Sequence, residues 1–335
     1  MAKLFEQPIL AIESSCDETS AAIVQGRSVR SNVIASQVEV HRKWGGVVPE
    51  AAARMHVEAI LPVITDACSE ADVTLEDLGA IAVTNRPGLV GALSVGVTAA
   101  KALAFFLGIP ILGIHHLEGH ICSAAVGNPT MPFPHTCLVV SGGHTEIVQV
   151  LELGHYEVVG ATRDDAAGEA FDKGARLLGL GTPGGAAIQA AAVGGNRHRY
   201  ALPKGLSGPT LDFSFSGLKT AVLRLVEKEG PSISISDAAA SLQEAIVSVL
   251  SERALLACRE LGSSALSLVG GVAANLELRS RLERGCSEAG LDFYAPPLEL
   301  CTDNAAMIGL AASYRLARGE SDTFDLDVRP NAPLP

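Results

Sequence analysis

The chain of 335 residues is 48% hydrophobic, carries a formal net charge of −12 and contains only 4% aromatic residues. This length and apolar content predict about two domains, each with a core of its own. The negative charge argues against binding of nucleic acid through a broad basic surface, and the few aromatic residues argue against an extended base-stacking platform. Any contact with RNA is therefore expected to be local or shared with a partner.

The cysteines and the apolar segments indicate the expected compartment. The seven cysteines are scattered and include no CxxC pair, so they indicate neither a disulfide framework nor a zinc ribbon. The first residues lack the hydrophobic region of a signal peptide, and no run of 18 uncharged apolar residues is long enough to span a bilayer. We expect a cytoplasmic protein that does not enter a membrane.

The first half of the chain predicts an α/β domain that opens with a hairpin. A strand over residues 8–12 ends in the acidic turn ESSCDETS (13–20), and a second strand follows over 21–24. A small, acidic turn of this kind can hold a phosphate or a metal ion. Further strands are expected over residues 31–40, 78–84 and 109–114, and helices over 51–70 and from the turn at 85–93 to 106.

The second half repeats this pattern after a proline-rich break at residues 127–134. Strands over 136–140 and 147–151 flank the glycine turn SGGHTE, as the first two strands flank ESSCDETS. Helices are expected over 166–178, 236–261, 276–289 and 301–319, and strands over 266–269 and 293–295. The predicted organisation is an N-terminal subdomain over residues 1–130, a C-terminal subdomain with Asp303 over 131–320, and a loosely held acidic tail over 321–335.

The strongest chemical motif is a pair of histidines that follows a buried strand. His116 and His120 are four residues apart, so a helix starting near Leu117 places both imidazoles on one face, where they can share a metal ion. Asp303, in a Thr-Asp-Asn turn at a helix start, is the candidate for a third ligand. Two histidines and one carboxylate suit Fe(II) or Zn(II) and leave positions open for water or a substrate oxygen.

The same run, HLEGH, resembles the HExxH motif of metalloproteases, but its glutamate is in another place. Glu118 is two residues after His116, about 200° around the helix from it. In HExxH the glutamate directly follows the first histidine and serves as the general base. The spacing therefore argues against a protease.

Three glycine turns in the second half indicate an anion or nucleotide site. They are the turns around Ser141-Gly142-Gly143, Gly184-Gly185 and Gly270-Gly271, and each follows or precedes a regular element. Backbone N–H groups in such turns suit a phosphate, and glycine lets an adenine or ribose approach the backbone closely. The chain has neither GxxxxGK[ST] nor GxGxxG after its first strand, which argues against a P-loop NTPase and a Rossmann dehydrogenase.

Several acidic residues have a structural and a functional interpretation side by side. Asp172 lies in a predicted helix, either on a solvated face or as an acceptor for ligand hydroxyls. The structural interpretation of Asp17 and Glu18 is that they form a turn. The functional interpretation is that they bind a metal ion or water, or act as a base. Arg197, Arg199 and Lys204 form the most basic local cluster and are the candidates for contact with RNA.

As a set, these motifs resemble the TsaD family, once described as O-sialoglycoprotein endopeptidases, over nearly the whole chain. The matching motifs are ESSCDET (13–19), GGVVPE (45–50), PGLVGAL (87–93), KALAFFLGIPILGIHHLEGHI (101–121), SGGHTE (141–146), FDKGARLLG (171–179), DFSFSGLKT (212–220), GGVAAN (270–275) and TDNAAMIG (302–309). The chain departs from the family pattern at Trp44, at Arg86 and in the TPGGA loop (182–186), and none of these changes removes a ligand.

The resemblance implies an α/β ASKHA fold, the actin and sugar-kinase superfold, with two related RNase H-like subdomains and a cleft between them. It implies transfer of the threonylcarbamoyl group of threonylcarbamoyl-AMP to N6 of adenosine 37 in tRNAs that read ANN codons, with release of AMP. It also implies that one divalent ion, usually iron with zinc as the alternative, is bound by His116, His120 and Asp303. The residues that match the family's nucleotide and substrate contacts are Val139, Val140, Ser141, Gly142, Gly143, Asp172, Gly185 and Asn275.

The expected partners, besides tRNA, are a shorter TsaB-like paralogue and a TsaE-like ATPase. Asp17 is our candidate for orienting or deprotonating the attacking amine. Three other classes are weighed against this interpretation. A sugar kinase of the same superfold lacks a reason for the two histidines, a metalloprotease is disfavoured by Glu118, and a non-catalytic scaffold would have lost the metal ligands.

Overall fold

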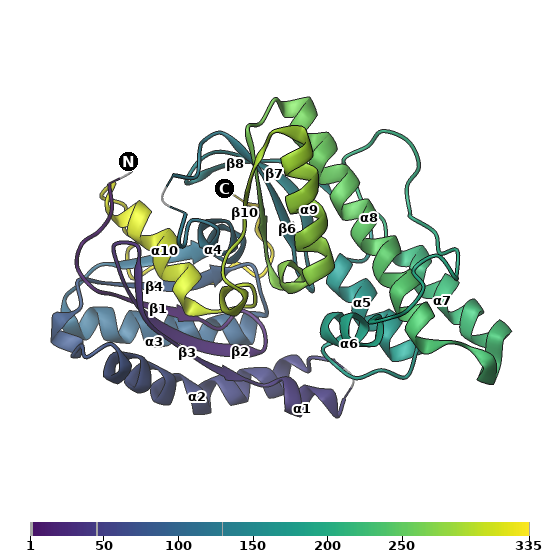
Figure 1. Ribbon diagram of the computed structural model, residues 1–335. Helices are drawn as coiled ribbons and strands as arrows, with labels where there is room; N and C mark the ends of the chain where they lie inside the picture. Colours follow the sequence, from purple (N-terminus) through teal and green to yellow (C-terminus); the bar gives the residue numbers. More distant parts are fainter. Residues whose placement is uncertain (1–2, 45, 129, 335) are drawn as a thin grey trace. The chain divides into compact units, whose positions relative to one another are not determined.

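The computed structural model describes residues 3–44, 46–128 and 130–334, so Gly45, the first residue of the GGVVPE motif, lies outside the described residues (Figure 1). The chain divides into two compact units. Unit 1 consists of Met1–Val126, Leu153–His155 and Asp303–Pro335, and unit 2 of Gly127–Glu152 and Tyr156–Thr302. Each unit is built around one five-stranded sheet.

Unit 1 is a three-layer α/β unit with the strand order β3-β2-β1-β4-β5. Helices α2 and α3 pack against one face of the sheet, while α4 and α10 contact each other and the strands of the other face (Figure 1). The elements are β1 Ile9–Glu13, β2 Glu18–Gln25, β3 Ser28–Ser36, α1 Val38–Arg42, α2 Pro49–Glu70, η1 Leu75–Asp77, β4 Ala80–Arg86, α3 Val90–Leu107, β5 Ile111–His115, α4 His116–Ser123 and α10 Ala305–Leu316. Because helices cover both faces, the central strand β1 is buried along its whole length.

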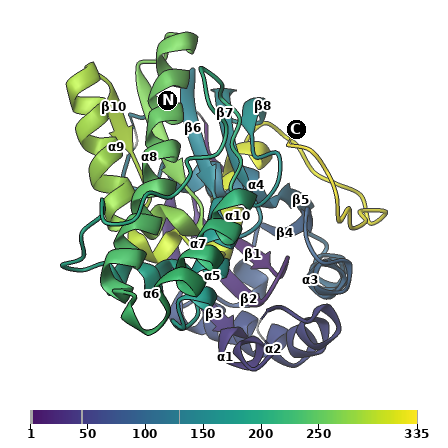
Figure 2. The ribbon, with the colours of Figure 1, turned by 90° about the vertical axis from the view of Figure 1, so that its right-hand side faces the viewer.

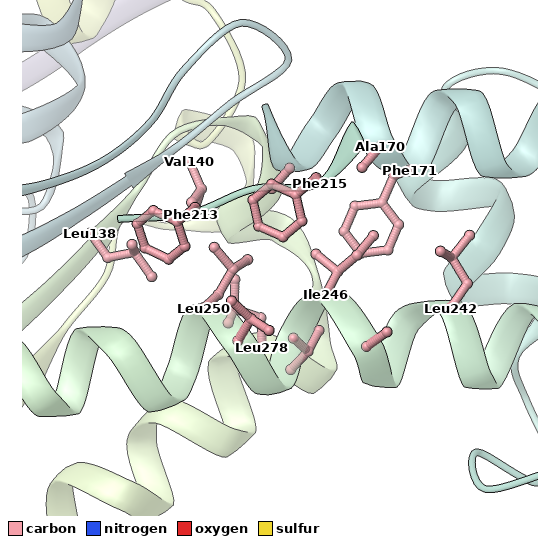
Figure 3. Packing of buried hydrophobic residues seen from close by; sticks show 14 of the residues in the cluster. Leu138, Val140, Ala170, Phe171, Phe213, Phe215, Leu242, Ile246, Leu250 and Leu278 are labelled. Atoms are coloured by element: carbon pink, nitrogen blue, oxygen red, sulfur yellow. The ribbon is translucent and has the colours of Figure 1, made fainter. Parts of the chain in front are cut away.

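Unit 2 has the strand order β10-β9-β6-β7-β8. Its elements are β6 His135–Val140, β7 Thr145–Glu152, β8 His155–Ala161, α5 Ala167–Leu177, α6 Gly184–Ala191, α7 Ser216–Glu229, η2 Gly230–Ser232, α8 Ile235–Leu261, β9 Ala265–Val269, η3 Gly271–Ala274, α9 Leu276–Ala289, β10 Asp292–Tyr294 and η4 Leu298–Leu300. Phe171, Phe213 and Phe215 are at most 1% exposed and pack against the buried side of α8, as Figure 3 shows. This packing joins the helices after β8 to the sheet.

The two sheets have the same connectivity, which confirms the predicted repeat. In each, the first strand pairs antiparallel with the second and parallel with the fourth: β1 with β2 and β4, and β6 with β7 and β9. The first hairpin closes at Glu13 opposite Ser20, and the second at Val140 opposite Thr145. The acidic turn and the glycine turn therefore occupy the same place in the two units.

The division into units corrects the predicted boundaries at one important point. The break near residue 127 agrees with the expected boundary at 130, but Asp303 and α10 belong to unit 1 and not to the C-terminal half. The reason is packing: α10 is buried against β1, β2 and α4. The segment after α10 also belongs to unit 1 and is held by hydrogen bonds, so the prediction of a loosely held tail was wrong.

Two local predictions were also wrong. The strand expected over 31–40 ends at Ser36, because its partner β2 begins at Glu18 opposite that residue, and a short helix follows. The loop expected over 182–186, with its turn at Gly184-Gly185, already contains the start of α6 at Gly184. The helix that carries the two histidines begins at His116, which agrees with the expected start near Leu117.

Helix α3 is long and apolar enough to cross a membrane by length and composition alone, a test that core helices of soluble proteins also pass. One side of α3 packs into unit 1 through small residues that include Ala92, Gly96 and Ala100. On another side, Phe105 and Phe106 are 75% and 81% exposed.

Candidate functional site

Helix α4 presents His116 and His120 from the end of the buried strand β5. The two rings lie 4.7 Å apart between centroids and are nearly perpendicular, at 87°. The glycine between them allows α4 to lie close to α10, because a Cβ at Gly119 would come within 2.8 Å of the Ile308 side chain. The HLEGH motif therefore supplies both candidate ligands and the small residue that brings them to α10.

Asp303 reaches the two histidines because the start of α10 is fixed to the sheet. The hydroxyl of Ser20 accepts from the N–H of Ala305 at 2.9 Å, and the side-chain oxygen of Asn32 accepts from the N–H of Ala306 at 3.2 Å. Asp303 Oδ1 then lies 3.1 Å from His120 Nε2 and 3.4 Å from His116 Nε2. Residues nearly 190 positions apart in the chain thus converge within unit 1.

This arrangement fits a divalent transition-metal ion. One ligand atom from each of the three residues lies within 4.8 Å of the others. Donors bound at about 2.1 Å to one ion are separated by about 3 to 3.5 Å, which agrees with both measured distances. Burial alone would raise the pKa of Asp303, but the charges and hydrogen bonds of the histidines lower it well below its ordinary value, so the carboxylate is ionised as a ligand must be.

Glu13 fixes the orientation of His116. The Nδ1 of His116 lies 3.0 Å from Glu13 Oε2 and 3.2 Å from the hydroxyl of Ser15. The other contacts of Glu13 are the N–H of Ser15 at 2.6 Å and the hydroxyl of Thr84 at 2.6 Å, so its carboxylate is fully used although it is completely buried. A carboxylate at Nδ1 holds the ring with Nε2 directed to Asp303, as is common behind metal-bound histidines.

The acidic turn after β1 is held by a second buried histidine. The Nε2–H of His56 donates to the carbonyl of Cys16 at 3.0 Å, and its Nδ1 accepts from the hydroxyl of Thr19 at 2.7 Å. Burial, then the neighbouring charge of Asp17, raises the pKa of Glu18 to about 9. Glu18 is thus protonated at neutral pH and unsuited to act as a base, which leaves Asp17 as the candidate in this turn.

In unit 2, the glycine turn Ser141–His144 closes tightly on the hydroxyl of Ser141. This hydroxyl accepts from the N–H groups of Gly143 at 3.3 Å and His144 at 3.0 Å. A Cβ on Gly142 or Gly143 would meet no atom within 4 Å, so the outer side of the turn is open. Val139 and Val140 are fully buried, and their contribution to a ligand would come from the backbone.

Other glycines bring further segments of unit 2 against this turn. Gly270 has φ +91° and lies so close to the carbonyl of Val140 that a Cβ would clash with it. Gly168, near the start of α5, lies against Ser141 and Gly142 in the same way. The GGVAAN segment, the start of α5 and the SGGHTE turn therefore meet at one end of β6.

The remaining predicted contacts of unit 2 have structural roles of their own. Asp172 accepts from the N–H of Gly184 at 2.7 Å and so caps α6, while Gly185 next to it is open. Asn275 caps α9 through the N–H of Leu278 at 3.0 Å and donates to Gln243 at 2.9 Å. Among the described residues, Gln243 borders a cavity of about 350 Å³ between α6, α8 and α9.

The basic cluster is partly neutralised within unit 2. Arg197 lies 3.0 Å from a carboxylate oxygen of Glu277, and Lys204 lies 3.1 Å from Glu252. All three predicted basic residues remain exposed. Their placement supports at most a weak local contact with a polyanion.

Sequence reasoning placed Glu13 and Ser15 in a turn that can hold a metal ion or a phosphate, but it gave no individual role in the site to them or to His56. Glu13 ends a fully buried strand, and a buried carboxylate needs a partner, so its position was a signal that could have been used. His56 lies on the buried face of α2 and gave no local signal, because its partners are about 40 residues earlier in the chain.

Comparison with known proteins agrees with this geometry. Residues 28–310 match the TsaD family, described as tRNA N6-adenosine threonylcarbamoyltransferase. The chain is 50% identical over 331 residues to the protein of that name from Clostridium botulinum (strain Kyoto / Type A2), covering 97% of both chains. It is 51% identical over 329 residues to that from Anaeromyxobacter dehalogenans (strain 2CP-C), covering 96% of this chain and 98% of the relative.

Solved structures with low sequence identity support the fold alone. Component A of the (R)-2-hydroxyglutaryl-CoA dehydratase of Acidaminococcus fermentans is 16% identical, with a TM-score of 0.57 over 93% of this chain and 100% of that one. HypF of T. kodakarensis is 15% identical, with a TM-score of 0.60 over 94% of this chain and 49% of that one. Both have the ASKHA fold, which the repeated sheet topology of this chain also shows. The chain belongs to the TsaD family of tRNA N6-adenosine threonylcarbamoyltransferases.

Proposed function

We propose that the chain transfers the threonylcarbamoyl group of threonylcarbamoyl-AMP to N6 of adenosine 37 in tRNAs that read ANN codons, with release of AMP. The observation that carries this proposal is the convergence of His116, His120 and Asp303 in a unit of the ASKHA fold. A sugar kinase or a scaffold of the same fold has no use for this trio, and Glu118 is buried beside Arg315, at 3.5 Å, where it cannot serve as a protease base.

In this proposal His116, His120 and Asp303 hold a divalent ion, Fe(II) in preference to Zn(II). When bound, such an ion polarises an oxygen of the activated group as a Lewis acid. Glu13 keeps His116 in the ligating tautomer through Nδ1. Asp17, in the turn held by His56, orients the attacking amine or accepts its proton.

The residues of unit 2 bind the AMP part of the substrate. The open side of the Ser141–Gly143 turn faces the phosphate, and the close approach at Gly270 brings the GGVAAN backbone to the same place. The adenosine extends toward Asn275 and the cavity bordered by Gln243. These contacts position the leaving group and stabilise its charge.

A protein partner is supported by the exposed apolar side chains of α2 and α3, two helices that pack against each other. Val57 and Leu61, one turn apart on α2, are 63% and 65% exposed, and Phe105 on α3 is 75% exposed. We assign this face to a TsaB-like paralogue, with a TsaE-like ATPase as a further component, in the cytoplasm. Replacing Val57 and Leu61 with aspartate is expected to abolish co-elution with the paralogue without lowering the melting temperature.

The activity is tested by transfer of labelled threonylcarbamoyl-AMP to ANN-decoding tRNA, with and without the partner proteins. The His116→Ala/His120→Ala variant is expected to lose transfer, whereas His155→Ala, at an exposed histidine, retains it. Absence of transfer by the unaltered chain with its partners, together with phosphorylation of a small molecule, would instead establish the kinase.

A further inference from the structure

The segment after α10 is bound along the open edge of the unit 1 sheet. Its Asp322 pairs with the edge strand β5: the N–H of Asp322 donates to the carbonyl of Ile111 at 2.8 Å, and its carboxylate accepts from the N–H of Gly113 at 2.8 Å. Further on, the carbonyl of Leu326 accepts from Nζ of Lys101 on α3 at 3.0 Å. Figure 2 shows this yellow segment running beside β5 and α3. The segment thus covers an edge that would otherwise present unpaired backbone groups.

The end of this segment reaches two loops that lead to the histidine cluster. The carbonyl of Pro330 accepts from the N–H of Gly88 at 3.1 Å, and the next residue, Leu89, donates its N–H to the carbonyl of Ser15 at 2.8 Å. The hydroxyl of Ser15 contacts Nδ1 of His116 at 3.2 Å. Three hydrogen bonds, linked through the covalent structure of Gly88–Leu89 and of Ser15, therefore connect residue 330 with a predicted metal ligand.

A second and shorter connection passes through His115, which is completely buried. Its Nδ1 accepts from the N–H of Leu117 at 3.2 Å and so caps the start of α4. Its Nε2 lies 3.1 Å from the carbonyl of Ala332. Only the neutral tautomer with its proton on Nε2 satisfies both contacts, because a backbone N–H needs an acceptor and a carbonyl needs a donor. The carbonyl of Ala332 thus stabilises the tautomer that caps α4.

We propose that residues 329–332 and His115 form a positioning device, here called the strap, which holds the start of α4 in the orientation that directs His116 and His120 at Asp303. The inference rests on the proposed function, because it takes these three residues as metal ligands. The strap acts on the site through the cap of α4 and through the Gly88–Ser15 contacts.

The test compares two shortened chains. A chain ending at Val328 keeps the apolar contacts of Leu326 and Val328 with the core of unit 1 but loses the contacts of residues 329–332. A chain ending at Pro333 keeps all of them, with Ala332 still an amide carbonyl and not a terminal carboxylate, and is the control. Affinity for Co²⁺ alone is measured by calorimetry and visible absorption, and amide exchange of residues 116–123 is measured in the metal-free protein.

The chain ending at Val328 is expected to bind Co²⁺ about tenfold more weakly and to exchange faster in α4, while the control matches the full chain. Equal affinity and equal exchange in the two shortened chains would overturn the proposal. If even the full chain fails to bind Co²⁺, the proposed metal site fails, and the exchange comparison still decides whether the strap orders α4.

A point variant at His115 separates the contact with Ala332 from the capping of α4. Asparagine at position 115 can cap α4 through its side-chain oxygen, but it is too short to retain the contact with Ala332. His115→Asn is expected to weaken Co²⁺ binding, but less than the shortening at Val328, which also removes the contact of Pro330 with Gly88. The combined variant is expected to lose little more than the shortened chain. The proposed connection through His115 would be contradicted if His115→Asn bound Co²⁺ as tightly as the unaltered chain. It would also be contradicted if the losses of Co²⁺ affinity in the two variants added fully in the combined one.

Discussion

The turns that follow β1 and β6 occupy the same place in two sheets of the same connectivity, yet their side chains suit ligands of opposite charge. The turn of unit 1 carries the carboxylates of Glu13 and Asp17 and lies beside buried histidines. The turn of unit 2, Ser141–His144, has no carboxylate of its own and is open above its glycines. The shared topology therefore places a turn after the first strand of each sheet, and the side chains of the turn determine whether it suits a cation or an anion.

Buried histidines show the same contrast. Burial alone would lower the pKa of His116, but the charges and hydrogen bonds of Asp303 and Glu13 raise it well above its ordinary value. In unit 2, the ring nitrogens of His135 contact the carbonyl of Pro132 and the hydroxyl of Ser267, and burial lowers the pKa of His135 to about 4. Carboxylates accompany His116 in unit 1, whereas neutral groups accompany His135 in unit 2, as they also do His56 and His115 of unit 1.

The largest expected effect concerns His135 and acid stability. The unfolded chain binds a proton at this residue below about pH 6.5, whereas the folded unit resists it until about pH 4, so stability present above pH 6.5 is lost as the pH falls. The cost is about 3 kcal/mol by pH 4. Urea unfolding at pH 7 and 4.5 is expected to show a smaller acid loss for His135→Gln. The same loss in both proteins would show that His135 protonates freely when folded.

The second prediction concerns the carboxylate behind His116. Glu13→Gln keeps the shape and an acceptor for the N–H of Ser15 but removes the charge that orients His116. Co²⁺ affinity is expected to fall about 10- to 100-fold, as for other residues behind a metal ligand. Calorimetry measures this change, and Glu6→Gln, at an exposed glutamate of unit 1, is the control. Unchanged Co²⁺ affinity in Glu13→Gln would show that the charge of Glu13 does not support metal binding by His116.

The third prediction introduces a carboxylate into the glycine turn of unit 2. The space above Gly143 accommodates a side chain, so neither Gly143→Asp nor Gly143→Asn is expected to lower the melting temperature. The aspartate repels the phosphate, and AMP binding is expected to be about tenfold weaker than in the asparagine variant. Equal AMP affinity in this matched pair would place the phosphate elsewhere.

The smallest effect is expected for tRNA. Removing the charges of Arg197, Arg199 and Lys204 with glutamine should weaken tRNA binding only about two- to threefold at fixed salt, because two of the three are paired with carboxylates. The measurement is a filter-binding titration with the partner proteins present, and Lys228→Gln is the control. Unchanged affinity of the triple variant would exclude this cluster from the tRNA interface.

Local pattern predicted the two hairpins, their turns, the strand before His116 and most helices. It also predicted His116 and His120 as a pair, because four-residue spacing on one helix is itself local information. It placed the start of α6 inside a loop, because the cap that starts this helix comes from Asp172, twelve residues earlier in the chain. Position in the sequence alone put Asp303 in the wrong unit.

The sequence by itself determined which chemistry the chain could perform: two imidazoles on one helix, a carboxylate at a helix start, and glycine turns free of acidic residues. Only the tertiary structure decided how these are joined. The contact of Asp303 with His120, the support of His116 by Glu13 and the strap at His115 link residues more than 100 positions apart. Such contacts follow from sheet order and from the packing of α10 on β1 and β2, and no local spacing encodes them.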